Sequence, residues 1–185
     1  MIVLGIDPGA TIGMALLDVP TTWKRGAPSR TGKACVVAVG AVRAVAGSAL
    51  RPVFDWLRAA RQKHWPTVEH ETVLEMVRDV GLPRLDVVGI ERPMGYAYQA
   101  ARVGPLLDAA WQGGELSGWA TTAKLATTVA AVPAGDWRRL VVGSPSARDA
   151  QVAVALESWV VGLGRTNAHG RDAIGVAIGA SLLPA

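Results

Sequence analysis

The chain opens with Met1-Ile2-Val3-Leu4-Gly5-Ile6-Asp7-Pro8-Gly9, and a second apolar run follows from Ile12 to Leu17. The first run predicts a short buried strand that ends at Asp7. A carboxylate beside a buried strand is unfavourable unless it is hydrated, paired or bound to a metal ion. Asp7 is therefore a candidate functional residue, although Asp before Pro-Gly is also a common turn sequence.

A second acid has the same setting. Val87 to Ile90 reads as another buried strand, and Glu91 stands at its exit, as Asp7 does in the first strand. A surface acid at the end of a strand would look the same in the sequence.

The segment from Asn167 to Ala180 predicts a helix whose first turn carries His169 and Asp172 on one face. Gly175 and Gly179 continue that face, and such small residues predict close packing of the helix on a sheet. Taken singly, His169 could be a capping or packing residue. The helix dipole alone would favour Asp172 at this end.

Three acids and an imidazole from two strand ends and a helix start suit hard divalent cations such as Mg²⁺. Two such ions would activate a water molecule and stabilise the leaving oxygen in phosphodiester cleavage. Imidazole suits borderline metals better than Mg²⁺, so His169 makes Mn²⁺ a second candidate.

The order of four sequence blocks resembles RuvC, the Holliday junction resolvase family of the ribonuclease H-like superfamily. The likeness spans nearly the whole chain. It implies an α/β, ribonuclease H-like fold with a five-stranded mixed sheet flanked by helices, in a single nuclease domain over residues 1–185. The blocks are Gly5 to Gly9, Gly89 to Glu91, Val141 to Gly143 with Ser146-Ala147 and Gln151-Val152, and His169 to Ala173.

The resemblance further implies a crossover junction endodeoxyribonuclease of DNA recombination and repair. Such an enzyme resolves four-way DNA junctions by paired symmetric nicks, and RuvC relatives are homodimers. Asp7, Glu91, His169 and Asp172 would be the catalytic and metal-binding set, with two Mg²⁺ or Mn²⁺ ions in each site. The commoner family residue at the place of His169 is Asp, and some members carry His.

Residues that would contact DNA come partly from the resemblance and partly from a basic loop between Pro20 and Lys33. RuvC enzymes place an aromatic residue three positions after the catalytic Glu, where this chain has Met94. The second family lysine aligns with Asp149. The loop reads either as a solvated hairpin tip or as a phosphate-contacting arm. The expected DNA-binding residues are Lys24, Arg25, Arg30, Lys33, Met94, Tyr96, Arg138, Arg139 and Arg148.

Other functions stay open on the sequence. The departures at Met94 and Asp149 leave room for a nuclease acting on other branched DNA or structured RNA, or for a junction-binding protein with weak catalysis. The first strand motif also resembles the phosphate-binding turn of actin-like and sugar-kinase ATPases. Those proteins repeat the domain, whereas this chain has one copy.

The length of 185 residues fits one domain with a sizeable core. The net charge of +4 favours a polyanionic partner, although a general bias toward basic residues would give the same value. No apolar segment approaches the roughly 20 residues needed to cross a bilayer, so we expect a cytoplasmic protein without a membrane partner. Cys35 lies in an apolar run and is expected to be a core thiol.

Periodicity places the remaining elements. The first three strands are expected to form an antiparallel meander, and the helix over Tyr96 to Gln112 is the expected dimer contact. The expected strands are Ile2 to Asp7, Ile12 to Asp18, Ala34 to Val42, the strand before Glu91, and Thr127 to Val132. Besides Tyr96 to Gln112, which would end at Gly113-Gly114, the other expected helices are one from Ser48, Thr67 to Val80, Leu116 to Leu125, Asp136 to Val142, and Ser146 to Trp159 capped by Ser146.

Overall fold

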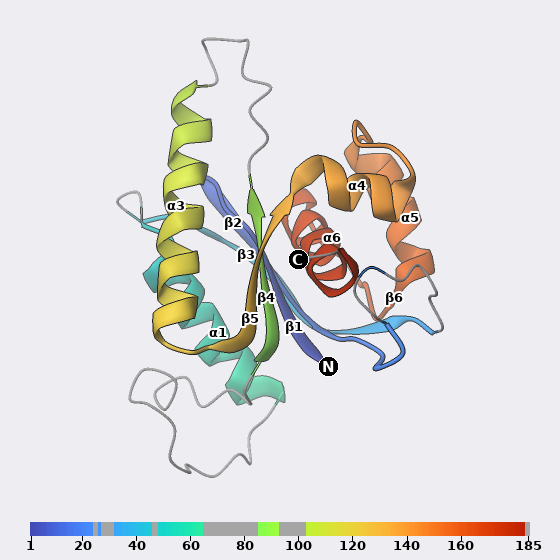
Figure 1. The fold of residues 1–185 in the computed structure, drawn as a ribbon, viewed down its shortest axis with the longest axis horizontal. Coiled ribbons are helices and arrows are strands. Elements are labelled where there is room, and N and C mark those ends of the chain that lie inside the picture. Colours follow the sequence, from blue (N-terminus) through green and yellow to red (C-terminus); the bar gives the residue numbers. More distant parts are fainter. Residues whose placement is uncertain (24–25, 27–31, 46–47, 65–84, 93–102, 184–185) are drawn as a thin grey trace.

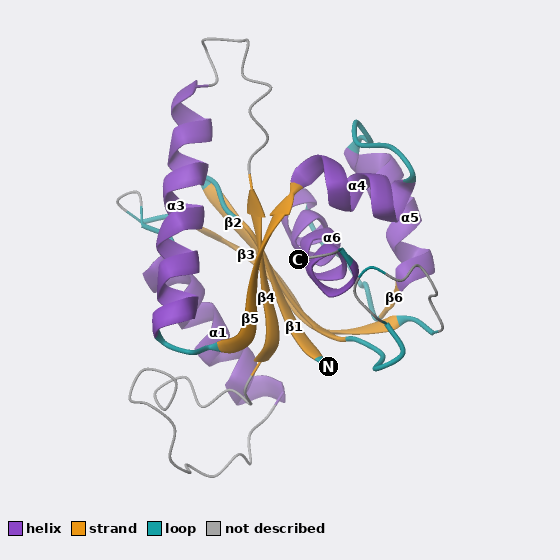
Figure 2. Cartoon of the chain, viewed as in Figure 1, coloured by secondary structure: helices purple, strands orange, loops and turns teal. Residues whose placement is uncertain are grey.

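The computed structural model describes residues 1–23, 26, 32–45, 48–64, 85–92 and 103–183. A mixed sheet lies between two helical layers (Figures 1 and 2). One layer holds α1 (Leu50–His64) and α3 (Val103–Thr122). The other holds α4 (Ala134–Val142), α5 (Asp149–Trp159) and α6 (Ala168–Leu182). The helix expected over Thr67 to Val80, and Met94, Tyr96, Lys24, Arg25 and Arg30, lie outside the described residues.

The sheet has the strand order β5-β4-β1-β2-β3-β6. The first three strands form the expected antiparallel meander, and β1, β4 and β5 are mutually parallel. The expectation of five strands is wrong by one, because the residues after α5 form a short strand beside the start of β3. That strand has two residues and gives no periodic signal. The strands are β1 (Ile2–Asp7), β2 (Thr11–Asp18), β3 (Ala34–Arg43), β4 (Leu85–Arg92), β5 (Ala126–Pro133) and β6 (Val160–Val161).

Alternate side chains of β1 point into two separate hydrophobic cores, as expected for a strand covered on both faces. Leu4 and Ile6 pack in the core under α1 and α3, whereas Val3 packs in the core under α6. Helix α6 is buried at every position from Ala173 to Leu182, because the sheet covers one side and α4 and α5 cover the other.

Helix α6 lies directly on the sheet because three strand residues lack side chains. A Cβ atom on Gly5 would strike the Ala173 carbonyl oxygen, and one on Gly13 would strike the His169 carbonyl oxygen. A Cβ atom on Gly89 would lie 2.6 Å from that of Ala180. The small residues that permit the contact therefore stand mainly in the sheet.

Gly175 and Gly179 were expected to face the sheet, and this holds only in part, for Gly179. Both meet Trp137 of α4, and Gly179 also meets Val132 of β5. The period of the glycines correctly indicated a close neighbour, but the sequence could not show that a second helix covers Gly175 and shares Gly179 with the sheet.

Three other local expectations are also wrong. Helix α3 runs through Gly113-Gly114, because packing on the sheet outweighs a propensity cost of about 1 kcal/mol per glycine. Helix α5 begins at Asp149 with Arg148, not Ser146, as its N-cap. Cys35 is exposed, because its neighbour Ala34 occupies the buried face of β3 and alternate side chains point to opposite faces.

In the described part of the chain, no helix combines the length and the apolar character required to span a bilayer.

We predict that Gly5→Ala lowers the free energy of unfolding by about 1–3 kcal/mol, toward the upper end, since the clash is with main-chain atoms that cannot rotate away. Urea unfolding measures the change. Gly9→Ala in the turn after β1 is the matched control: a Cβ atom there would lie no closer than 3.5 Å to the Thr11 carbonyl oxygen, an ordinary contact, and the change should stabilise the chain by about 0.4–1 kcal/mol. Equal effects of the two substitutions would contradict the close helix–sheet contact.

Candidate active site

The carboxyl ends of β1 and β4 bring Asp7 and Glu91 to one edge of the sheet. The two strands are parallel, and Ile6 pairs with Ile90, so the next residue of each strand is the acid. Both predicted strand-end acids therefore leave the sheet side by side.

The start of α6 completes the set. Asn167 caps this helix, its side-chain oxygen accepting a hydrogen bond of 2.8 Å from the Gly170 amide. The cap and the close contact at Gly13 place the first turns of α6 over the ends of β1 and β2. His169 and Asp172 thereby join the two strand-end acids, as their spacing predicted.

Among the described residues, each acid has a side-chain hydrogen-bond partner. The Nδ1 atom of His169 lies 3.1 Å from Asp7 Oδ2. The Arg138 guanidinium donates to Asp172 Oδ2 at 2.9 Å, and the Trp137 indole N–H donates to Glu91 Oε2 at 3.0 Å. Asp7 and Asp172 are only 13% and 16% exposed, so these partners replace much of the lost water.

Burial raises the pKa of all three acids, and repulsion from other acids adds to it. Burial, followed by the negative charge of Asp172, raises the pKa of Asp7 to about 7 despite the opposing charge of Arg138. Burial, followed by the charge of Asp7, raises the pKa of Glu91 to about 8, although the Trp137 hydrogen bond and Arg138 lower it. Burial also raises the pKa of Asp172, opposed first by Arg138. The cluster therefore disfavours three simultaneous negative charges.

The donor set fits a hard cation in its chemistry, since three carboxylates that repel one another would be stabilised by added positive charge. In the described residues, no three His, Cys, Asp or Glu side chains converge in positions to hold one metal ion. Two of the acids are instead engaged by His169 and Arg138. A bound ion would have to compete with these contacts and with protons.

Sequence analysis named Arg138 only as an expected DNA contact and gave Trp137 no role in the site. The indole is fully buried and also bonds a site acid. The available signal was the pair Gly175 and Gly179, four residues apart on α6, which leaves room for a large neighbour.

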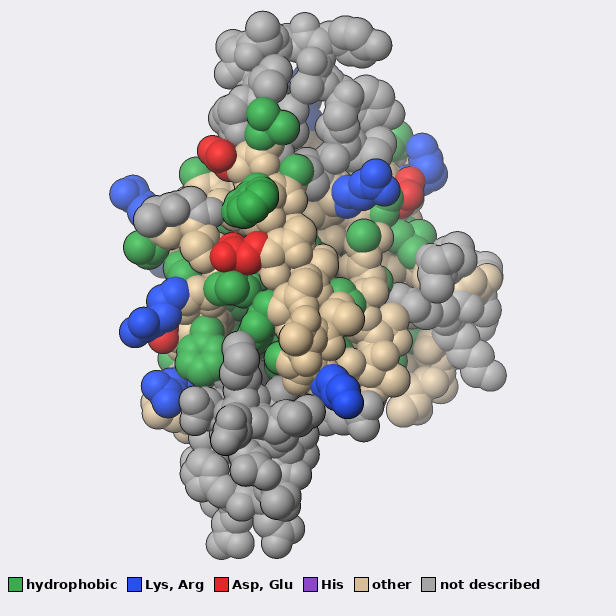
Figure 3. Space-filling model, turned by 60° about the vertical axis from the view of Figure 1, so that its left-hand side comes forward, with side chains coloured by type: hydrophobic (Ala, Val, Ile, Leu, Met, Phe, Trp, Pro, Cys, Tyr) green, Lys and Arg blue, Asp and Glu red, His purple; other side chains and the backbone are tan. Residues whose placement is uncertain are grey.

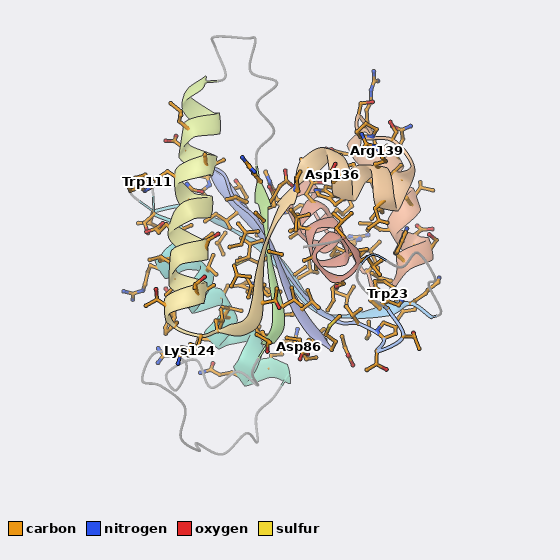
Figure 4. All side chains as sticks on the ribbon, viewed as in Figure 1. Trp23, Asp86, Trp111, Lys124, Asp136 and Arg139 are labelled. Atoms are coloured by element: carbon orange, nitrogen blue, oxygen red, sulfur yellow. The ribbon has the colours of Figure 1, made fainter. Side chains whose placement is uncertain are left out.

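The other expected DNA contacts that the structure describes lie on α4, directly before α5 and directly before β3. The Lys33 ammonium donates to the Glu157 carbonyl at 2.7 Å. Arg139 is exposed on α4 and lies 3.4 Å from Asp136, both labelled in Figure 4. Arg148 is exposed at the start of α5.

Trp23 belongs to the core and not to an exposed arm. It is 4% exposed and packs edge-on against Trp159, with ring centroids 5.7 Å apart. The beginning of the basic loop is therefore anchored beside α5 (Figure 4).

A hollow of about 320 Å³ opens between β5, α4 and the C-terminal half of α6. Asp136 and Gly179 line it, but none of the four candidate site residues does. The acid cluster is thus a site on the edge of the sheet, separate from this hollow.

No protein-family model and no curated protein matches the sequence. Solved structures do match. RuvC of T. thermophilus in complex with a Holliday junction substrate is 19% identical, with 96% of this chain and 91% of that chain covered and a TM-score of 0.61. A second Thermus thermophilus RuvC structure is 22% identical, with 96% and 92% covered and a TM-score of 0.52. The yeast mitochondrial Holliday junction resolvase Ydc2 is 10% identical over 96% of this chain and 77% of that one, with a TM-score of 0.45.

The two Thermus matches confirm the α/β, ribonuclease H-like architecture that the sequence blocks implied. The chain therefore has the fold of RuvC.

Proposed function

We propose that this chain is a metal-dependent, structure-selective endonuclease that resolves four-way DNA junctions by paired nicks. The observation that carries the proposal is the meeting of Asp7, Glu91 and Asp172 at one sheet edge, with burial and repulsion raising the pKa of all three. Three such acids have no evident structural use, whereas phosphodiester cleavage by bound cations needs them.

Asp7, Glu91, Asp172 and His169 would hold two Mg²⁺ or Mn²⁺ ions, whose chemistry is to activate water and to stabilise the leaving oxygen. Arg138 now neutralises Asp172 and is 20% exposed, so it is placed to exchange this partner for a DNA phosphate. The exposed cations Lys33, Arg139 and Arg148 would add phosphate contacts that orient the DNA without reading its sequence.

The direct test is cleavage of a synthetic mobile four-way junction, with duplex, flap and single-stranded DNA as controls, in Mg²⁺ and in Mn²⁺. We expect nicking of the junction in preference to the three controls. Asp7→Asn should abolish nicking, by about 10³-fold or more, yet keep junction binding, because it removes a charge from the site without changing its shape.

Asp86→Asn is the matched control. Asp86 stands at the opposite end of β4 from Glu91, is exposed, and accepts the Ile2 amide at 2.7 Å (Figure 4). The Asp86→Asn variant should cut the four-way junction as the unmodified chain does. Cleavage that survives Asp7→Asn would refute the acid site. Junction binding without cleavage in either metal would favour a junction-binding protein, and preferred cutting of flaps would favour another branched substrate.

The same Asp7→Asn variant should be more stable than the unmodified chain in the absence of metal. The folded-state pKa of Asp7 is raised from 3.8 to about 7, so the folded protein holds a proton that the unfolded chain has lost between these values. The contribution of this proton to the free energy of unfolding is complete below pH 3.8 and is lost as the pH rises through about 7. The variant carries no such charge, so its free energy of unfolding at pH 8 should exceed that of the unmodified chain by about 2–4 kcal/mol.

Urea unfolding at pH 4, 6 and 8 in EDTA measures this difference, which should grow with pH. Added Mn²⁺ should then stabilise the unmodified chain but not the variant, because it binds only the folded site. A stability difference that is the same at all three pH values would show that burial and repulsion do not raise the pKa of Asp7.

A homodimer is the second part of the proposal, since a four-way junction is two-fold symmetric and needs two sites on opposite strands. Helix α3 offers the surface. Leu107 and Trp111 are 64% and 75% exposed, and Gly114 and Gly118 continue the same stripe with open space above them. Hydrophobic side chains gather along the middle of this face (Figure 3), and Trp111 projects away from the sheet (Figure 4). A second copy of the chain is the occupant we propose for this stripe.

Trp111→Glu should dissociate the dimer, raising its dissociation constant at least about 30-fold, because it puts two charges at the symmetric contact. Sedimentation equilibrium measures the change, and the variant should nick one strand without paired cutting. Val154→Glu on α5 is the control, since Val154 is 70% exposed away from the stripe and should leave the dimer intact. A monomeric unmodified chain, or a dimer in both variants, would exclude α3 as the contact.

A further inference from the structure

The Trp137 side chain joins the core of the helical layer to the acid cluster. Its ring is fully buried in α4, and its indole N–H donates to Glu91 Oε2 at 3.0 Å. Glu91 stands on β4, so this single hydrogen bond ties a helix of one layer to the end of a central strand.

The space for this ring depends on two glycines in α6, which lower the stability of that helix. A Cβ atom on Gly175 would overlap the six-membered part of the ring, and one on Gly179 would lie 2.9 Å from the Trp137 Cβ. Two glycines inside a helix destabilise it by about 0.5–1 kcal/mol each relative to alanine. A smaller apolar side chain at 137 would fill the core without requiring them.

The ring also lies against its neighbour in sequence. The Arg138 guanidinium lies 4.6 Å from the Trp137 ring centroid and donates to Asp172. The indole is therefore held between α6 and a guanidinium, and it has little freedom to rotate away from Glu91.

Two other indoles of the same layer, that of half-buried Trp159 and that of buried Trp23, help to show that this hydrogen bond is more than a routine partner for a buried N–H. Trp159 donates to the main-chain carbonyl of Val141, and the indole nitrogen of Trp23 has no hydrogen-bond partner in the described part of the chain. Among the described residues, one indole N–H of this layer thus has a main-chain acceptor and another has none. Trp137 instead bonds a carboxylate of the candidate site.

We infer that Trp137 is a positioning residue that fixes the carboxylate of Glu91 in the orientation needed for cation binding and cleavage. A neutral donor suits this task, because it restrains the carboxylate and leaves its negative charge in place. The inference deepens the proposed nuclease function and rests on it for the reaction, but the contact itself can be tested without any reaction.

Trp137→Phe is the first test, because it keeps an aromatic ring among Gly175 and Gly179 and removes the N–H donor. We expect Mn²⁺ affinity of the DNA-free protein, measured by calorimetry, to fall about 10–100-fold. The turnover number on the junction should fall by a similar factor, while KM, junction affinity and melting temperature stay near those of the unmodified chain.

Trp159→Phe is the matched control, because it removes an indole N–H of the same layer that donates to a main-chain carbonyl. It should leave Mn²⁺ affinity and turnover unchanged. Equal losses in the two variants, or unchanged Mn²⁺ affinity and turnover in Trp137→Phe, would overturn the positioning role.

A metal-free test keeps the inference separate from the proposed function. The indole N–H resonance that disappears in Trp137→Phe identifies this side chain in the nitrogen–proton NMR spectrum. In Glu91→Ala that resonance should move and exchange faster with solvent, and an unchanged resonance would overturn the contact. If the unmodified chain neither binds Mn²⁺ nor cuts junctions, the proposed function fails, and this resonance still decides whether Trp137 holds Glu91. If Trp137→Phe does not fold, the through-space contacts of the indole N–H with neighbouring protons assign the resonance, and its response to Glu91→Ala tests the contact in the same way.

Discussion

The close approach of α6 to β1 and β2 is the constraint on which the site depends. Gly5 and Gly13 let the helix main chain lie directly on the two strands. The first turn of α6 begins beside Gly13, so His169 reaches Asp7, and Asp172 comes within the electrostatic reach of both strand-end acids. Side chains on the strands would lift the helix and separate these groups. Main-chain packing therefore sets the positions of the charges.

Those charges work against the stability of the fold that holds them. Burial and repulsion disfavour ionisation of Asp7 and Glu91, and Arg138 pairs directly with Asp172. A cluster arranged only for stability would replace such acids with neutral or apolar groups. Because the chain keeps these acids, an added cation would relieve repulsion between them that the protein itself does not cancel.

The elements that carry the acids could be predicted because each has a strong local pattern. The runs before Asp7 and Glu91 are continuous and apolar, and His169 and Asp172 share a helix face by spacing alone. Long-range contacts override weaker local signals elsewhere. Helix α3 continues through Gly113-Gly114 because it packs on the sheet. Residues 160–161 form a strand only because β3 lies beside them. The partners of the acids were beyond local patterns, since each contact joins residues far apart in the chain.

Helix α4 shows why the order of two neighbouring residues matters to this chemistry. Trp137 gives Glu91 a neutral donor, and Arg138 gives Asp172 a cation while stacking on the same ring. A neutral donor restrains a carboxylate and leaves its charge, whereas a guanidinium offsets it. The charge directly offset by a hydrogen-bonded guanidinium is therefore that of Asp172. The pKa of Glu91 rises to about 8 and that of Asp7 to about 7. A cation bound at the end of the sheet would therefore favour ionisation of these two acids.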